Sequence, residues 1–138
     1  MLRSVGAVLA GFVAATIVVV LSTALAVALM LPPAGPGMMP EPTGPYLAVN
    51  LFCGLLAAIF GGWLAARLAR RAPLGHAMAV GTIMLVLGLA AAAMESDGSS
   101  GSQPGWYLYA LPLLGWIGAS LGGVVEARSE KGEARSKR

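Results

Sequence analysis

Charged residues are scarce in this sequence of 138 residues, where they make up 11% of the chain against 57% for hydrophobic residues. Soluble domains carry about 25% charged residues. The deficit is concentrated in four long uncharged runs, and such runs are typical of transmembrane helices. The sequence therefore predicts an integral membrane protein, with the lipid bilayer as its surroundings.

Cysteine is almost absent, because Cys53 is the single cysteine and lies within an apolar run. A disulfide framework and a cysteine metal site are therefore excluded. The net charge of +3 comes from residues at the ends of the apolar runs and in the C-terminal tail. No folded basic domain presents these residues to a duplex, so nucleic acid is not expected as a partner. The excess of Ala, Gly and Arg over Lys indicates a GC-rich bacterial genome.

The four runs predict an all-α membrane protein, folded as a four-helix transmembrane bundle. The expected spans are residues 5–31, 46–69, 74–94 and 106–125, and residues 126–138 form a charged cytoplasmic tail. The first run is about 40 Å long as a helix, more than the roughly 30 Å hydrocarbon core, so it should tilt or protrude. A cleaved signal peptide is the alternative, but the apolar region of a signal is typically about 7–15 residues.

The basic residues predict the orientation. In a four-span arrangement all nine Lys and Arg residues fall on one side, and the two opposite loops carry only acidic residues. Positive charge accumulates on the cytoplasmic side, so both termini are expected in the cytoplasm of a bacterial inner membrane. Aromatic residues are expected at the outer interface, namely Tyr46, Trp106, Tyr107 and Tyr109.

An internal repeat relates the second span to the fourth at an offset of 61 residues. It predicts two tandem parallel helical hairpins about an axis along the membrane normal. Chance resemblance between Ala- and Gly-rich spans is the alternative. The shared ends pair Gly44, Tyr46 and Arg67 with Gly105, Tyr107 and Arg128.

Small residues recur at every fourth position in both copies. They are Gly54, Ala58, Gly62 and Ala66 in the second span, and Gly115, Ala119, Gly123 and Ala127 in the fourth. Helices in lipid associate through close van der Waals contact, and a stripe of small residues forms the groove for it. These eight positions are predicted to pack helices, either within the chain or at a dimerisation face.

Arginines at the cytoplasmic span ends are candidates for anchoring to lipid headgroups. They are Arg67, Arg70, Arg71 and Arg128. Guanidinium groups at this depth pair with anionic headgroups, so anchoring is the expected role and specific lipid recognition is the alternative.

Residues 118–122 match a serine hydrolase motif in sequence, but not in the local structure that the motif needs. Residues 118–122 read G-x-S-x-G, and Ser120 and His76 both lie towards the cytoplasmic side, so a dyad is geometrically possible. The motif needs a strand-to-helix turn that exposes the serine, whereas these residues lie inside an expected span. We therefore expect no enzymatic activity, and no motif points to a cofactor.

The remaining polar residues give weaker signals. Asn50 is predicted either to bond another helix or to line a cavity, and His76 to contact headgroups. Met38 and Met39 carry thioethers that bind Cu(I) in other settings, but no histidine or cysteine lies near them. Hydroxyls inside the spans are expected to bond their own backbone, at Thr16, Ser22, Thr23 and Thr82.

One region reads Asn50…Gly61-Gly62-Trp63-Leu64-Ala65-Ala66-Arg67…Pro73…His76-Ala77. This pattern resembles one found in small, uncharacterised bacterial four-helix membrane proteins, and the resemblance implies the topology without a mechanism. The expected function is that of a helix-packing or accessory subunit, which self-associates or binds a larger membrane partner. The alternative is a small oligomeric transporter or channel. No charged residue lies at central depth in any span, which disfavours ion pumps and proton-coupled exporters.

Overall fold

The computed structural model describes residues 2–33, 41–69, 72–95 and 103–136, which form four α-helices. α1 covers Leu2–Met30, α2 covers Gly44–Ala69, α3 covers Pro73–Glu95 and α4 covers Gly105–Ser136. The predicted all-α, four-helix class is confirmed. Each helix is long and apolar enough to cross a membrane.

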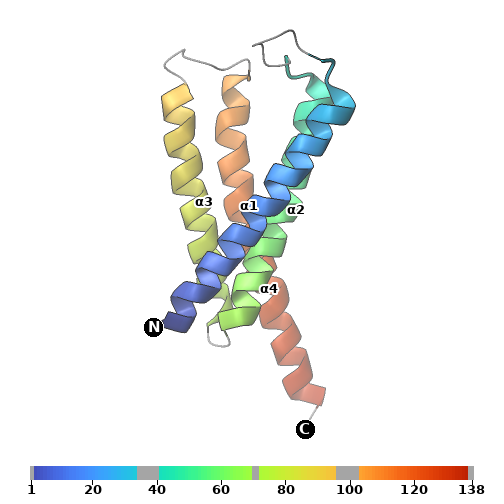
Figure 1. Ribbon diagram of the computed structural model, residues 1–138. Helices are drawn as coiled ribbons and strands as arrows, with labels where there is room; N and C mark the ends of the chain where they lie inside the picture. The colour runs from blue at the N-terminus through green and yellow to red at the C-terminus, as the bar shows by residue number, and fades with distance from the viewer. Residues whose placement is uncertain (1, 34–40, 70–71, 96–102, 137–138) are drawn as a thin grey trace.

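The central contact of the bundle is between α2 and α4. α1 packs mainly on α2, and α3 packs mainly on α4, whereas the backbones of α1 and α4 do not approach closely in the described ranges. Figure 1 shows α1 crossing the bundle obliquely, from a start near α3 to a C-terminal part beside α2. α1 and α3 therefore diverge away from the end that carries the chain termini.

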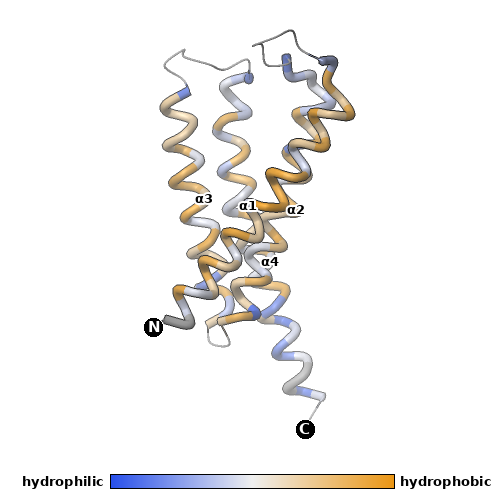
Figure 2. Tube along the Cα trace, viewed as in Figure 1, coloured by the Kyte–Doolittle hydropathy of each residue, from blue (hydrophilic) through white to orange (hydrophobic). Residues whose placement is uncertain are grey.

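The two ends of the bundle differ in charge. The termini and the α2–α3 turn lie at one end, called the basic end because it carries Arg67, Arg128, Lys131 and Arg135 (Figure 1). The other end is called the acidic end, after Glu41 and Glu95. Figure 2 shows apolar residues along the middle of the helices, and hydrophilic residues along the C-terminal part of α4. That part continues to Ser136, so the tail predicted to follow the fourth span from residue 126 is helical as far as residue 136.

The interior of the bundle is built from small side chains and its surface from large apolar ones. Ala58, Ala65, Ala66 and Ala119 are completely buried, whereas every helix exposes several large apolar side chains. Soluble proteins show the opposite arrangement, because water drives large apolar side chains inside. In lipid this driving force is absent, and close approach of small residues stabilises the helix contacts instead.

The α2–α3 turn is held by a hydrogen-bonded cap on α3. Ala72 has a φ of 49°, a left-handed conformation that costs a non-glycine residue roughly 1–2 kcal/mol. Its carbonyl oxygen accepts bonds from the backbone N–H groups of Gly75 and His76, at 3.0 and 3.4 Å. Pro73 opens α3, where its missing N–H needs no partner. The short turn keeps α2 and α3 antiparallel neighbours.

Candidate functional site

Small residues bring α2 and α4 into backbone contact. A Cβ added to Gly62 would lie 2.6 Å from the Cα of Ala119, and one added to Gly118 would lie 2.9 Å from the Cβ of Ala58. Real side-chain carbons do not approach this closely. Two of the predicted packing positions on α2 and one on α4 therefore lie in the same interface.

The other predicted packing positions are enclosed to different degrees. Gly123 faces α3, where an added Cβ would overlap a buried alanine, and Gly54 faces a leucine side chain of α4 at 3.1 Å. Gly115 has more room, since the nearest atom to its added Cβ lies 3.9 Å away. Ala66 is completely buried, and Ala127 is half-buried. Most of these residues are therefore occupied by contacts within the chain.

The two halves of the chain make their hairpin contacts at different registers. In the first half, Gly11 of α1 packs against the backbone of Gly61 in α2. In the second half, Gly81 of α3 packs against Trp116 of α4. The repeat aligns Gly61 with Gly122, so an equivalent contact would have been at Gly122. Each hairpin contact forms where that hairpin has a small residue, and the two contacts do not fall at positions that the repeat aligns. The tandem hairpin arrangement therefore stays a prediction.

A chain of hydrogen bonds joins three helices near the acidic end. Thr23 of α1 donates from Oγ1 to Asn50 Oδ1 of α2 at 2.7 Å, and Asn50 Nδ2 donates to the hydroxyl of Tyr107 on α4. Asn50 is 8% exposed and Tyr107 is 2% exposed. A polar group buried in a membrane bundle needs such partners, because lipid supplies none. These three residues are called the Thr23–Asn50–Tyr107 network.

The sequence anticipated only part of this network. Asn50, predicted either to bond another helix or to line a cavity, does both. The expectation that Thr23 bonds its own backbone is wrong, because the crossing of α1 over α2 brings its hydroxyl to Asn50. Thr16 and Ser22 do bond their own helix, as predicted. No local pattern in α1 marked Thr23 for this contact.

A groove opens beside the network, between α1 and α3. Its mouth is a cavity of about 300 Å³ whose lining includes the polar side chains of Thr23, Tyr46, Asn50, Glu95, Gln103 and Tyr107. A deeper, apolar cavity of about 200 Å³ is lined by residues that include Phe12, Met84 and Leu87. The two cavities share four lining residues, Val19, Gly88, Leu111 and Pro112, so they lie next to each other. We call the two together the acidic-end groove.

Pro112 shapes the floor of this groove. It lies inside α4, where it removes one helical N–H, and its ring packs against Gly88 of α3. A Cβ on Gly88 would lie 2.8 Å from the Cβ of Pro112. Neither residue was singled out from the sequence, although a proline inside an apolar run is a visible signal. The pair allows α3 and α4 to approach while α1 stays apart.

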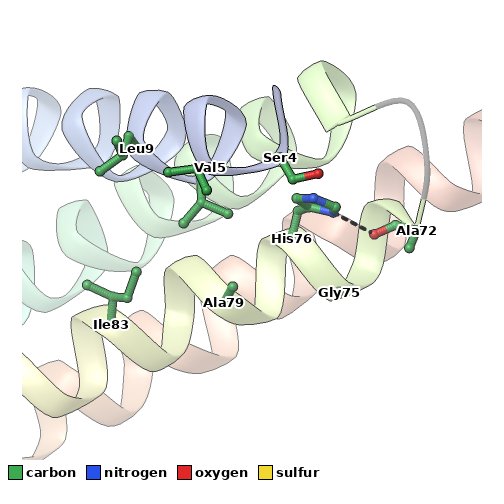
Figure 3. A pocket seen from close by; sticks show the side chains of 9 residues that line it. Ser4, Val5, Leu9, Ala72, Gly75, His76, Ala79 and Ile83 are labelled. Carbon is green, nitrogen blue, oxygen red and sulfur yellow. Dashed lines mark hydrogen bonds between the residues drawn. The ribbon is translucent and has the colours of Figure 1, made fainter. Parts of the chain in front are cut away.

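A third cavity, of about 420 Å³, lies between α1 and α3 at the basic end. Figure 3 shows Ser4, Val5 and Leu9 of α1 facing the α3 side chains His76 and Ile83 across it. The His76 ring donates from Nδ1 to the Ala72 carbonyl at 3.1 Å. The predicted contact of His76 with headgroups stays a prediction.

The structure does not assemble the residues of the hydrolase motif into a dyad. Ser120 Oγ donates to the Trp116 carbonyl at 2.9 Å, one turn earlier on α4. His76 is bonded to Ala72, and no hydrogen bond within the described ranges joins it to Ser120. In the same part of the chain, no three His, Cys, Asp or Glu side chains are grouped as a metal site would require.

The predicted anchoring arginines have different surroundings. The guanidinium carbon of Arg67 lies 5.0 Å from the ring centroid of Trp63, a cation–π contact worth about 0.5–1 kcal/mol at exposed sites. Arg128 is exposed on α4, where the repeat places Val124 instead of a tryptophan. The other predicted positions, Arg70, Arg71, Met38 and Met39, lie outside the described residues.

The fold and these sites define a class: a bundle of four apolar helices with the dimensions of a multi-pass membrane protein. The chain matches no protein-family model, no curated protein and no solved structure.

Proposed function

We propose that the protein is a non-enzymatic, multi-pass protein of the bacterial inner membrane. It acts through helix packing, either by self-association or as an accessory subunit of a larger membrane partner. Both termini are in the cytoplasm in this proposal. The gathering of Arg67, Arg128, Lys131 and Arg135 at one end supports that orientation, because basic residues favour the cytoplasmic side.

The observation that carries the proposal is the incomplete burial of α1. α1 has the highest mean hydropathy of the four helices, yet 11% of its apolar window is buried, against 39% for α2. Exposed branched side chains follow its outward side at every fourth position, at Leu9, Val13, Ile17, Leu21 and Leu25. Ridges with this spacing pack into the grooves of another helix. In this proposal, the second membrane segment packs along this ridge of α1.

Cross-linking combined with native mass measurement tests the proposal. Cys53 is replaced by alanine, and one new cysteine is placed at Leu21 on α1 or, as a control, at exposed Leu113 on α4. We expect bifunctional maleimides to cross-link Leu21→Cys to a second copy or to a stoichiometric partner, in membranes at native expression. The Leu113→Cys control should cross-link much less. A monomeric mass in mild detergent, with no α1 cross-link in membranes, would refute the proposal.

The acidic-end groove favours a second candidate, a small oligomeric transporter or channel. Asn50 lines the groove together with other hydrogen-bonding side chains, as a path for a small uncharged solute requires. The groove and the basic-end cavity share no lining residue, so a path would have to connect them. Stopped-flow permeability of proteoliposomes to glycerol and urea decides this point. Permeability equal to that of empty liposomes would remove the candidate for these solutes.

A further inference from the structure

We propose that the acidic-end groove binds a zwitterionic aminophospholipid, with one acyl chain inserted between α1 and α3. This is a ligand site beyond the packing role proposed above. It is argued from the shape of the groove, from the order of its polar and apolar parts, and from the charge at its mouth.

The groove has the shape that an acyl chain needs. Its two cavities, of about 300 and 200 Å³, run from the acidic end towards the middle of the bundle and share lining residues. Sites for small molecules usually have volumes of about 300–1,000 Å³. The groove lies where α1 diverges from α3, and the proposal places the entry of the chain from the bilayer on this side.

The lining changes character along the groove as an amphiphile does. The deeper part presents Phe12, Met84 and Leu87, which suit an acyl chain. The mouth presents Asn50, Tyr107 and Gln103, which suit a headgroup. The Tyr107 hydroxyl accepts a bond from Asn50, and its own proton has no acceptor in the described part of the chain. That proton is available to a phosphate oxygen at the mouth.

Charge at the mouth selects the headgroup. Glu95 lines it, and no Lys or Arg occurs between Arg3 and Arg67 or between Arg71 and Arg128. An ammonium group pairs with the Glu95 carboxylate, whereas an anionic headgroup such as phosphatidylglycerol meets a like charge and no cation. The site therefore prefers phosphatidylethanolamine, whose phosphate reaches Tyr107 while its amine reaches Glu95.

Blocking variants test the site. Ala91 is exposed on α3 and lines the mouth, so Ala91→Phe should fill it without entering a helix contact. Ala90 is also exposed and does not line the groove, which makes Ala90→Phe the matched control. Val19→Phe fills the groove from α1, at a position shared by both cavities. Ala79→Phe fills the basic-end cavity instead and controls for the loss of any cavity.

The measurement is native mass spectrometry of protein exchanged into vesicles of equal phosphatidylethanolamine and phosphatidylglycerol. We expect the wild-type chain, Ala90→Phe and Ala79→Phe to retain one phosphatidylethanolamine. Ala91→Phe and Val19→Phe should each lower that retention at least about tenfold, the ratio that a lost 1.4 kcal/mol produces. Glu95→Gln should keep a bound lipid but lose the preference between the two headgroups.

Three results would overturn the site. The first is equal retention by Ala91→Phe and Ala90→Phe. The second is a wild-type chain that holds no lipid, or that holds both lipids in proportion to the vesicle composition. The third is loss of lipid by Ala79→Phe together with the groove variants, which would indicate general annular binding. Thermal unfolding of each variant accompanies the measurement, so loss of fold is recognised separately from loss of lipid.

Discussion

Replacing Gly62 with leucine is expected to separate α2 from α4 and to cost about 3 kcal/mol or more of the free energy of unfolding. A Cβ at this position would already lie 2.6 Å from the backbone of Ala119, and the leucine side chain adds three further carbons. Backbone atoms cannot rotate away as a flexible side chain can, so the interface must open. Unfolding by increasing SDS in a mild detergent, followed by circular dichroism and tryptophan fluorescence, measures the loss.

Gly6 supplies the control for this variant. It lies in α1, and an added Cβ there meets no atom within 4 Å. Gly6→Leu is therefore expected to leave the unfolding midpoint almost unchanged. If Gly62→Leu unfolds at the same SDS fraction as Gly6→Leu, close packing of α2 on α4 is not what stabilises the bundle.

Replacing Asn50 with leucine is expected to destabilise the bundle by about 1–3 kcal/mol, since it removes two interhelical hydrogen bonds worth about 0.6–1.7 kcal/mol each. It also leaves the hydroxyls of Thr23 and Tyr107 without this partner. Thr23→Val and Tyr107→Phe should each cost less than the loss of Asn50, because each removes one bond. The same SDS unfolding assay compares the three variants.

The control for the Asn50 series is Thr16→Val. Thr16 donates to the Phe12 carbonyl of its own helix and is exposed, so Thr16→Val should lower the free energy of unfolding much less than Asn50→Leu. A double-mutant cycle between Thr23→Val and Asn50→Leu should show coupling, because the two side chains share one bond. Additive effects in that cycle, or an unfolding midpoint of Asn50→Leu equal to that of Thr16→Val, would contradict the network.

The helices themselves were largely predictable because their signals are local. Each apolar run is bounded by proline, glycine or charge, as at Gly44, Pro73 and Gly105, where helices begin. The C-terminal end of α4 was not predictable in this way, because the hydropathy of the sequence falls after residue 125. The segment that follows is rich in Ala, Glu, Lys and Arg, which are strong helix formers in water. The helix therefore extends beyond its apolar part.

The contacts between helices were harder to predict because neighbouring small residues face different partners. Gly61 packs on Gly11 of α1, while the adjacent Gly62 packs on Ala119 of α4. Successive residues point about 100° apart on a helix of 3.6 residues per turn, so one Gly-Gly pair serves two interfaces. A sequence stripe shows that close contact is possible without showing which helix makes it.

The Thr23–Asn50–Tyr107 network shows the same limit at a polar site. Asn50 stood out because it is an amide within an apolar span, whereas Thr23 and Tyr107 each had an ordinary local explanation. Their roles depend on the oblique crossing of α1 and on the register between α2 and α4. Both are properties of the packed bundle that no single span encodes.

Insertion of the bundle in a membrane underlies every proposal above, and cysteine accessibility tests both the insertion and the proposed cytoplasmic position of the basic end most directly. In a Cys53→Ala background, Gln103→Cys lies at the acidic end and Ser129→Cys lies on the exposed C-terminal part of α4. A membrane-impermeant maleimide is expected to label Gln103→Cys in intact spheroplasts and Ser129→Cys only after permeabilisation. Labelling of Ser129→Cys in intact spheroplasts, or labelling of Gln103→Cys only after permeabilisation, would contradict this orientation.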